Sequence, residues 1–276
     1  MSAPAAHDAP PAVLTEAQAR RALPALNWLG TIVYAVIAVT VLLGLWEALI
    51  RIYQVPIWLV PKPTDFLARL VTDAPLLLEH AGVTATTIVL GFLLGVAVAV
   101  PAGFLIVSFG ALERGLYPVI VFLNIMPKTV IGPILIVWFG IGPLVSVLIV
   151  FLMCFFPIMV DAMSGFRAVD PKLAYITRSM GATPLQELRH IRIPAAMPSI
   201  YAGMKIGIVK AVEGVIIAEF IASEAGLGFL IMRASSFMDL TLMFAGLIAT
   251  ALLALAVNAV LMSGERLLMP WARRPA

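Results

Sequence analysis

The hydrophobic and polar residues of this chain fall into long apolar runs separated by short polar segments. Six runs reach roughly the 20 apolar residues that a helix needs to cross a bilayer. They are approximately Trp28–Ile50, Val83–Val107, Leu116–Phe139, Leu144–Met163, Ile200–Ile221 and Leu240–Met262. Because hydrocarbon offers the backbone no hydrogen bonds, each run should be helical, and neighbouring helices can satisfy backbone groups freed by internal Gly and Pro residues. The pattern predicts an all-α membrane protein with about six transmembrane helices.

Composition indicates that lipid rather than water surrounds these runs. Of the 276 residues, 62% are hydrophobic and 12% are charged, whereas an ordinary soluble domain has roughly 45–50% and about 25%. A very large interface in a soluble complex is the alternative, but its apolar residues would form stripes rather than continuous runs. The single cysteine, Cys154, excludes an internal disulfide and any metal site that needs several cysteines.

The positions of lysine and arginine predict the orientation, because cytoplasmic loops of membrane proteins carry the excess of these residues. With the N-terminus inside, eleven lie in segments predicted to be cytoplasmic and four in external segments, while Lys128, Lys205 and Lys210 lie within or near spans. We therefore expect a cytoplasmic tail over residues 1–27, a transmembrane domain over 28–263 with a cytoplasmic loop at 165–199, and a cytoplasmic tail over 264–276.

Two predicted external regions are longer than hairpins. Region 51–82 contains Val60-Pro61-Lys62-Pro63-Thr64, followed by a short amphipathic stretch, Asp65–Leu78. Region 222–239 contains Gly226-Leu227-Gly228 and is net acidic. These regions could contact an external partner or only cap the ends of helices, and the sequence leaves both interpretations open.

The cytoplasmic loop between the fourth and fifth runs has the pattern of two short helices separated by a glycine. Asp170 can cap a helix that begins at Pro171, and Gly181 can end it in the left-handed conformation. Thr183-Pro184-Leu185-Gln186 then forms a capping box for a second helix, which we expect to end before Pro194. The loop residues expected to carry its function are Asp170, Leu173, Ile176, Arg178, Met180, Gly181, Ala182, Thr183, Leu185, Leu188, Ile191 and Pro194. Such a loop either docks onto a partner or lies on the membrane surface against lipid phosphates.

This loop resembles the cytoplasmic EAA loop of ABC importer permeases, in which Glu-Ala-Ala precedes a glycine, an isoleucine and a Leu-Pro pair at fixed spacing. Gly181, Ile191, Ile193 and Pro194 stand at matching positions, and Tyr175-Ile176-Thr177 replaces the triplet. The resemblance extends along most of the chain. The segments similar to permeases of the nitrate/sulfonate/taurine type are Val60–Thr64, Ile125–Lys128, Trp138–Gly142, Phe155–Ile158, Ala218–Phe220 and Gly226–Phe229.

The resemblance implies a permease of the bacterial inner membrane that forms a dimer. It also implies that a periplasmic binding protein delivers a small polar, heterocyclic or organic-anion nutrient, and that an ABC ATPase dimer holds the loop as a coupling helix. The chain contains no Gly-x-x-x-x-Gly-Lys-Ser/Thr phosphate loop. We therefore expect no enzymatic activity and no cofactor in this chain, with ATP and magnesium bound by the partner ATPase.

Four charged residues inside the runs are candidates for a translocation path: Lys128, Lys210, Glu213 and Glu219. A charge at the bilayer centre costs at least roughly 2.5–3.5 kcal/mol, so each needs a partner or a function. Lys210 and Glu213 can pair on one helix face, and Lys128 can meet carbonyls freed by a kink at Pro127. The alternative is snorkelling or structural pairing, which is favoured for Lys205.

An ion-gradient-driven secondary transporter would also explain buried charges. It leaves the glycine-centred loop unexplained, however, and the sequence contains no evident inverted repeat. A membrane enzyme or assembly factor is disfavoured, because no constellation of catalytic residues is found. An ATP-driven importer permease is therefore the leading interpretation, with the identity of the solute left open.

Overall fold

The computed structural model describes residues 24–170, 172–173, 177 and 179–269, with side chains described for residues 33–265 and 269 within these ranges. All regular elements among them are helices, as predicted. The contacts between residues divide the chain into two units. The first consists of the chain up to Pro56 together with Lys62–Thr64. The second consists of Ile57–Pro61 and the chain from Asp65 onward.

The first unit is built on helix α2 (Pro24–Ile52), which contains the first predicted span. Near its end Glu47 forms an ion pair with Arg51, at 2.6 Å, and accepts a hydrogen bond from the backbone N–H of Thr64 at 3.2 Å. The Glu47 carboxylate at this end of the helix therefore has both an ion-pair partner and a hydrogen-bond donor. The helix begins at Pro24, four residues before the predicted boundary of the transmembrane domain.

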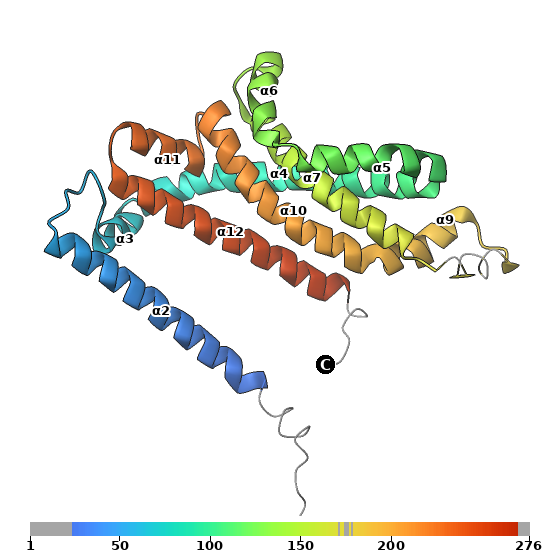
Figure 1. The fold of residues 1–276 in the computed structure, drawn as a ribbon, viewed down its shortest axis with the longest axis horizontal. Coiled ribbons are helices and arrows are strands. Elements are labelled where there is room, and N and C mark those ends of the chain that lie inside the picture. Colours follow the sequence, from blue (N-terminus) through green and yellow to red (C-terminus); the bar gives the residue numbers. More distant parts are fainter. Residues whose placement is uncertain (1–23, 171, 174–176, 178, 270–276) are drawn as a thin grey trace, which may run out of the picture. The chain divides into compact units, whose positions relative to one another are not determined.

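The centre of the second unit is formed by α4 (Ala74–Ser108), α7 (Pro143–Arg167) and α10 (Ile193–Ala222), which pack along one another (Figure 1). Small residues allow this close approach, as is common where helices pack in membranes. A Cβ atom at Gly95 would lie 2.5 Å from the Cys154 sulfur, and one at Gly207 would lie 2.7 Å from Ile158. Cys154 is thus a buried packing residue between α4 and α7.

Helix α12 (Leu240–Leu268) packs against α10, α4 and the short helix α11 (Leu227–Ser236). α11 occupies most of the region 222–239, for which the sequence predicted only a long external segment. The region 51–82 contains the amphipathic helix α3 (Pro63–Thr72), and the predicted amphipathic stretch Asp65–Leu78 is divided between α3 and the start of α4. α12 extends five residues beyond the predicted end of the transmembrane domain at residue 263.

The third apolar run is broken, which corrects the expectation of a helix throughout Leu116–Phe139. α5 (Gly110–Ile125) is followed by the 3-10 turn η1 (Lys128–Val130) and α6 (Ile131–Phe139), with a bend of 79° between the two parts. Met126 has an extended ψ of 134°, because the ring of Pro127 disfavours the helical conformation of the preceding residue. The break places Lys128 at a turn rather than on a helix.

Four helical segments in the described part of the chain are each long and apolar enough to cross a membrane. They lie in α2, α4, α7 and α12. Two further pairs of helices are each bent at a short break: α5 with α6, and Pro184–Ala222 with α11. The total is six spans if each pair counts as one span. The predicted number of about six is therefore consistent with the fold.

Candidate functional site

The described residues at the two ends of the first predicted loop helix make the contacts that the sequence predicts. The Asp170 carboxylate accepts a hydrogen bond from the backbone N–H of Lys172 at 2.8 Å, which is the contact of a helix N-cap. Gly181 has a φ of +81°, and the N–H of Ala182 donates to the carbonyl of Thr177 at 3.0 Å. This is the long bond of a Schellman turn, which a left-handed glycine makes possible. Ile176 and Arg178, two predicted site residues, lie outside the described residues.

The capping box is also confirmed. The Thr183 hydroxyl accepts from the N–H of Gln186, and the Gln186 side chain accepts from the N–H of Thr183 at 2.8 Å. Both bonds satisfy backbone donors that a helix start would otherwise leave free. The helix that follows, α9, spans Pro184–Glu187.

The expected end of this second helix before Pro194 is wrong. α9 continues through a π turn, η2 (Leu188–Arg192), directly into α10. Pro194 has no N–H to donate to the carbonyl four residues earlier, and its ring would clash with that carbonyl. The wider π turn, in which Ile193 donates to Leu188, removes this conflict without ending the helix. The loop is thereby joined to a membrane helix by an unbroken helical path.

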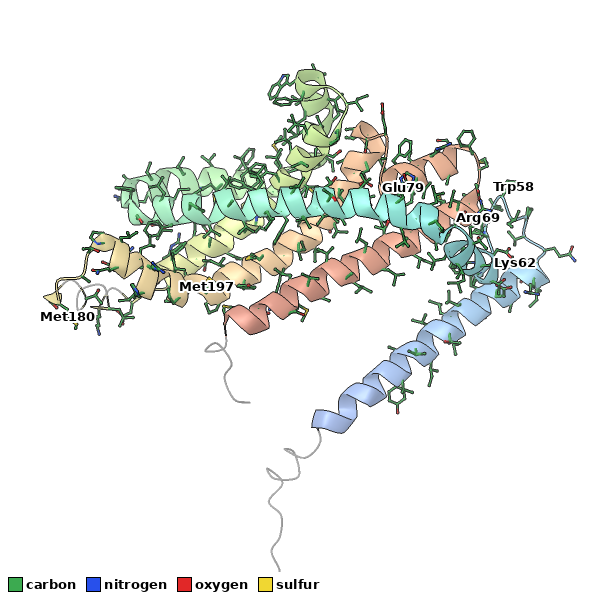
Figure 2. All side chains as sticks on the ribbon, turned by 180° about the vertical axis from the view of Figure 1, so that it is seen from behind. Trp58, Lys62, Arg69, Glu79, Met180 and Met197 are labelled. Carbon is green, nitrogen blue, oxygen red and sulfur yellow. The ribbon has the colours of Figure 1, made fainter. Side chains whose placement is uncertain are left out.

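The tip of this hairpin presents apolar side chains that no described residue covers. Met180 is 80% exposed, Leu185 is 73% exposed and Leu173 is 45% exposed. Figure 2 shows Met180 at the far end of the hairpin, away from Met197 on α10. The remaining described site residues Ala182, Leu188, Ile191 and Pro194 are half-buried. At the base, Glu187 is buried and forms an ion pair with Arg192 at 2.7 Å.

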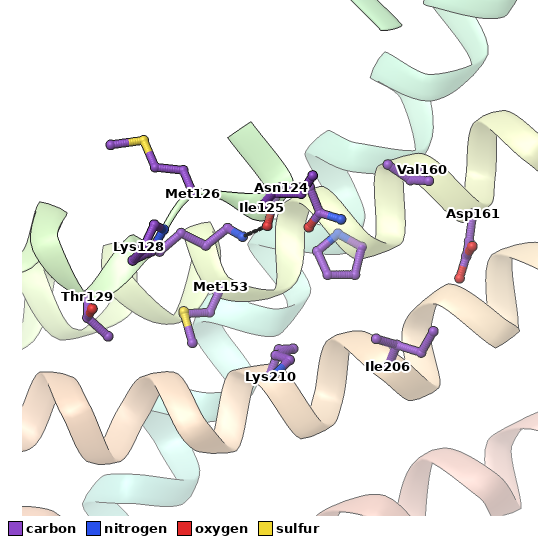
Figure 3. Close-up of a pocket in the computed structure, with 12 residues that line it drawn as sticks. Asn124, Ile125, Met126, Lys128, Thr129, Met153, Val160, Asp161, Ile206 and Lys210 are labelled. Carbon is purple, nitrogen blue, oxygen red and sulfur yellow. Dashed lines mark hydrogen bonds between the residues drawn. The ribbon is translucent and has the colours of Figure 1, made fainter. Parts of the chain in front are cut away.

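A second feature is a cavity of about 510 Å³ between the break after α5, α7 and α10 (Figure 3). Its charged lining residues are Lys128, Asp161 and Lys210. The Lys128 ammonium donates to the carbonyl of Asn124 at 2.6 Å, which confirms that a lysine side chain can meet a carbonyl freed by the break. The ammonium also lies 5.4 Å from the centre of the Phe156 ring, within the range of a cation–π contact.

Lys210 and Glu213 pair as predicted, at 2.7 Å. Lys205 pairs with Glu265 on α12, at 2.6 Å, in line with the structural interpretation favoured for it. Asp161 was missed by the sequence reasoning, although it is the one acidic residue in the run Leu144–Met163. Like Lys210, Asp161 is a charged residue inside an apolar run and therefore needs a partner or a function.

Glu219 does not line the cavity. Its side chain is buried, and its carboxyl group accepts hydrogen bonds from Thr84 Oγ1 at 2.8 Å and from the N–H of Gly228 at 2.7 Å. The N–H of Leu227 donates in turn to Thr84 Oγ1, and the N–H of Gly226 donates to Nδ1 of His80. We call these six residues the α11 latch, because they join the start of α11 to α4 and α10. The contacts cross 135 residues of sequence, so no local pattern could have indicated them.

Together these features place a cavity with charged lining residues and an exposed apolar hairpin along one helix, α10. No group of three or more His, Cys, Asp or Glu side chains that could hold a metal ion is found among the described residues. The cavity offers charged groups within a bundle of apolar helices, and the hairpin offers an apolar surface at the end of the same helix α10.

Comparisons with known proteins agree with this description. Residues 87–274, which include the hairpin and the cavity, match the family model "Binding-protein-dependent transport system inner membrane component". A probable ABC transporter permease protein of Haemophilus influenzae is 30% identical over 210 residues, covering 76% of this chain and 86% of the relative. The riboflavin transport system permease protein RibX of Chloroflexus aurantiacus is 30% identical over 237 residues, covering 85% and 88%.

The taurine transport system permease protein TauC of Escherichia coli is 28% identical over 238 residues, covering 84% of this chain and 86% of the relative. Among solved structures, an inward-facing conformation of the MetNI methionine ABC transporter has a similar fold. Its TM-score is 0.55 at 18% identity, and the match covers 70% of this chain and 97% of the other.

Proposed function

Since the chain belongs to the family of binding-protein-dependent transport system inner membrane components, we propose that two copies of it pair around a solute path and are driven by a separate ATPase. The chain is the permease subunit of an ABC importer. In the proposed assembly an ATPase dimer binds the cytoplasmic side, where ATP and magnesium are held, and a periplasmic binding protein delivers the solute. Both termini of the permease then lie in the cytoplasm, as the lysine and arginine distribution favours.

The observation that carries the proposal is the hairpin that ends in exposed apolar side chains and continues into α10. Exposed apolar groups such as Met180 and Leu185 are stabilised when a partner covers them. A force applied there would act on α10 without crossing a flexible linker, because α9, η2 and α10 form one helical path. We propose that the hairpin is the coupling element and that nucleotide-driven closure of the ATPase moves α10 as a rigid body.

The same helix links the hairpin to the proposed path. Lys210 lies on the cavity, Glu213 pairs with it one turn further on, and Glu219 belongs to the α11 latch. We propose that Lys128, Lys210 and Glu213 border the solute path and that Glu219 holds its external end. The proposed solute is a small polar, heterocyclic or organic-anion nutrient, a class that includes the substrates named for the taurine and riboflavin relatives.

Co-purification tests this assignment. The tagged chain is expressed with candidate ABC ATPase and exported binding-protein subunits from the same genome, and solute uptake is measured in proteoliposomes with and without ATP. Leu185→Glu should lower retention of the ATPase by at least about tenfold. Phe237→Glu is the matched control, because Phe237 is 76% exposed at the end of α11, far along the chain from the hairpin. Equal ATPase retention by both variants, or uptake that does not depend on ATP, would contradict the proposal.

A further inference from the structure

The cavity between α5, α7 and α10 contains two charged side chains without an ion-pair partner among the described residues. Among the described residues, Lys128 contacts the carbonyl of Asn124 and the ring of Phe156. Asp161 forms no hydrogen bond or ion pair with the described part of the chain, whereas Lys210 forms an ion pair with Glu213. One positive and one negative charge are therefore left facing the same space.

The packing of α7 against α10 explains why Asp161 stays at the cavity. Gly203, Ile206 and Lys210 share one face of α10 at spacings of three and four residues. A Cβ atom at Gly203 would lie 3.2 Å from Oδ2 of Asp161, so the glycine leaves room for the carboxyl group beside the α10 backbone. Figure 3 shows Asp161 and Lys128 at opposite ends of the cavity.

An unpaired charge at membrane depth is costly, and such charges mark pathways for water, ions or solutes. A simple anion bound by Lys128 would meet repulsion from Asp161, and a simple cation bound by Asp161 would meet repulsion from Lys128. A molecule with one charge of each sign is attracted at both ends. The lining between them includes apolar side chains, among them Met153, Pro157 and Ile206, which suit a short apolar spacer.

We propose that this cavity is a transfer site for a small zwitterion, whose anionic group meets Lys128 and whose cationic group meets Asp161. The inference rests on the proposed function, since it names the class of solute that passes through the permease. The cavity volume of about 510 Å³ lies within the range of small-molecule sites. Lys210 also lines the cavity and forms its ion pair with Glu213, which is not among the residues that line it.

Charge-selective labelling tests the site without a known substrate. Thr129→Cys places a thiol beside Lys128, and Val160→Cys places one beside Asp161; both positions line the cavity. Each full-length variant is labelled in membranes with an anionic sulfonatoethyl and a cationic trimethylammonioethyl methanethiosulfonate. The parent chain measures background from its own cysteine, Cys154, which is buried.

We expect the anionic reagent to react about tenfold faster than the cationic one at residue 129, with the reverse preference at residue 160. That factor is the order expected when one unit charge roughly 10 Å away acts with opposite sign on the two reagents at an effective dielectric constant near 50. Lys128→Gln should abolish the first preference, Lys128→Arg should keep it, and Asp161→Asn should abolish the second. Lys205→Gln is the matched control, because Lys205 pairs with Glu265 and does not line the cavity.

Protection experiments then identify the solute class. The zwitterion 2-aminoethanesulfonate should slow labelling at both positions, whereas ethanesulfonate should protect only residue 129 and ethylammonium only residue 160. Protection of both positions by ethanesulfonate alone would overturn the zwitterion proposal in favour of an anion site. Reagent preferences that survive Lys128→Gln and Asp161→Asn, or no labelling at either position, would also overturn it. Labelling requires no ATPase, so these results stand apart from a failure of ATP-driven uptake.

Discussion

Substitutions in the α11 latch can separate the contribution of hydrogen bonding to stability from the contribution of the Glu219 charge. Glu219→Ala removes the acceptor of the Gly228 N–H, which is buried at the start of α11. Thr84 loses its shorter contact at 2.8 Å but retains the carbonyl of His80, at 3.2 Å, as an acceptor. One donor is thus left unsatisfied, at a cost of about 1–3 kcal/mol. The void left by the shorter side chain adds to this cost.

Glu219→Gln should leave stability nearly unchanged. The new amide oxygen can accept from the N–H of Gly228, and the amide nitrogen can donate to Thr84 Oγ1. The Thr84 hydroxyl then donates to the carbonyl of His80, so every donor of the wild-type latch keeps a partner. We expect a difference within about 1 kcal/mol of the wild-type chain, because the number of hydrogen bonds is conserved.

Thermal unfolding of the purified protein in detergent measures the difference. At about 2–4 °C per kcal/mol, Glu219→Ala should unfold roughly 2–12 °C lower than the wild-type chain. Val209→Ala is a control on the same helix, because this residue is 53% exposed and surface substitutions away from buried partners change stability little. If Glu219→Gln unfolds as early as Glu219→Ala, the hydrogen-bond argument is refuted and the charge itself stabilises the latch.

Uptake by the same variants addresses the predicted role of Glu219 in the solute path. A stable Glu219→Gln variant that no longer supports uptake would indicate that transport needs the carboxylate. A stable variant with normal uptake would limit Glu219 to holding α11. A second variant approaches the latch from its other side: a Cβ atom at Gly226, where φ is +113°, would overlap the Glu219 carboxyl group. Gly226→Ala should therefore be at least as destabilising as Glu219→Ala.

Three further outcomes are expected. Gly181→Leu places a side chain at a left-handed φ of +81°, which costs about 1–2 kcal/mol, and it should uncouple ATP hydrolysis from uptake. Gly82→Leu is the control, because this glycine lies in open space on a helix, and uptake should stay coupled to ATP hydrolysis. Normal ATP-driven uptake by the Gly181→Leu variant would refute the role of the hairpin. Lys210→Ala and Glu213→Ala should each impair uptake or assembly more than the double substitution does, and strictly additive losses would argue against the pair. Gly207→Val should overpack α10 against α7 and cost about 1–3 kcal/mol, measured as a lower unfolding temperature, whereas unchanged stability would show that the helices can separate at no cost.

The prolines explain why the apolar pattern predicted the positions of the spans but not which span is bent. Pro101 and Pro157 lie inside continuous helices, whereas Pro127 ends α5. All three lack the same backbone donor, so their chemistry alone does not distinguish them. Around Pro127 the Lys128 ammonium binds the carbonyl of Asn124, a contact that partly offsets the loss of helical hydrogen bonds. Which proline bends a span therefore depends on the partners that its freed backbone groups find.

The sequence alone determined the features that depend on a few neighbouring residues or on the absence of water. Apolar runs must become helices in lipid, and the caps at Asp170, Gly181 and Thr183 are local hydrogen-bond patterns. The pair Lys210–Glu213 follows likewise from spacing on one helix. These were the predictions that the structure confirmed.

Tertiary structure decided what depends on residues that are distant in sequence. Asp161 lines the cavity because α7 packs against α10, and Lys128 lines it because the chain breaks after α5. Only the approach of α4 to α10 and α11 turns Glu219 from an isolated acidic residue into an acceptor for Thr84 and Gly228. The physical reason is the same in both cases: a buried polar group is stabilised by the partners that surround it, and chain neighbours do not specify those partners.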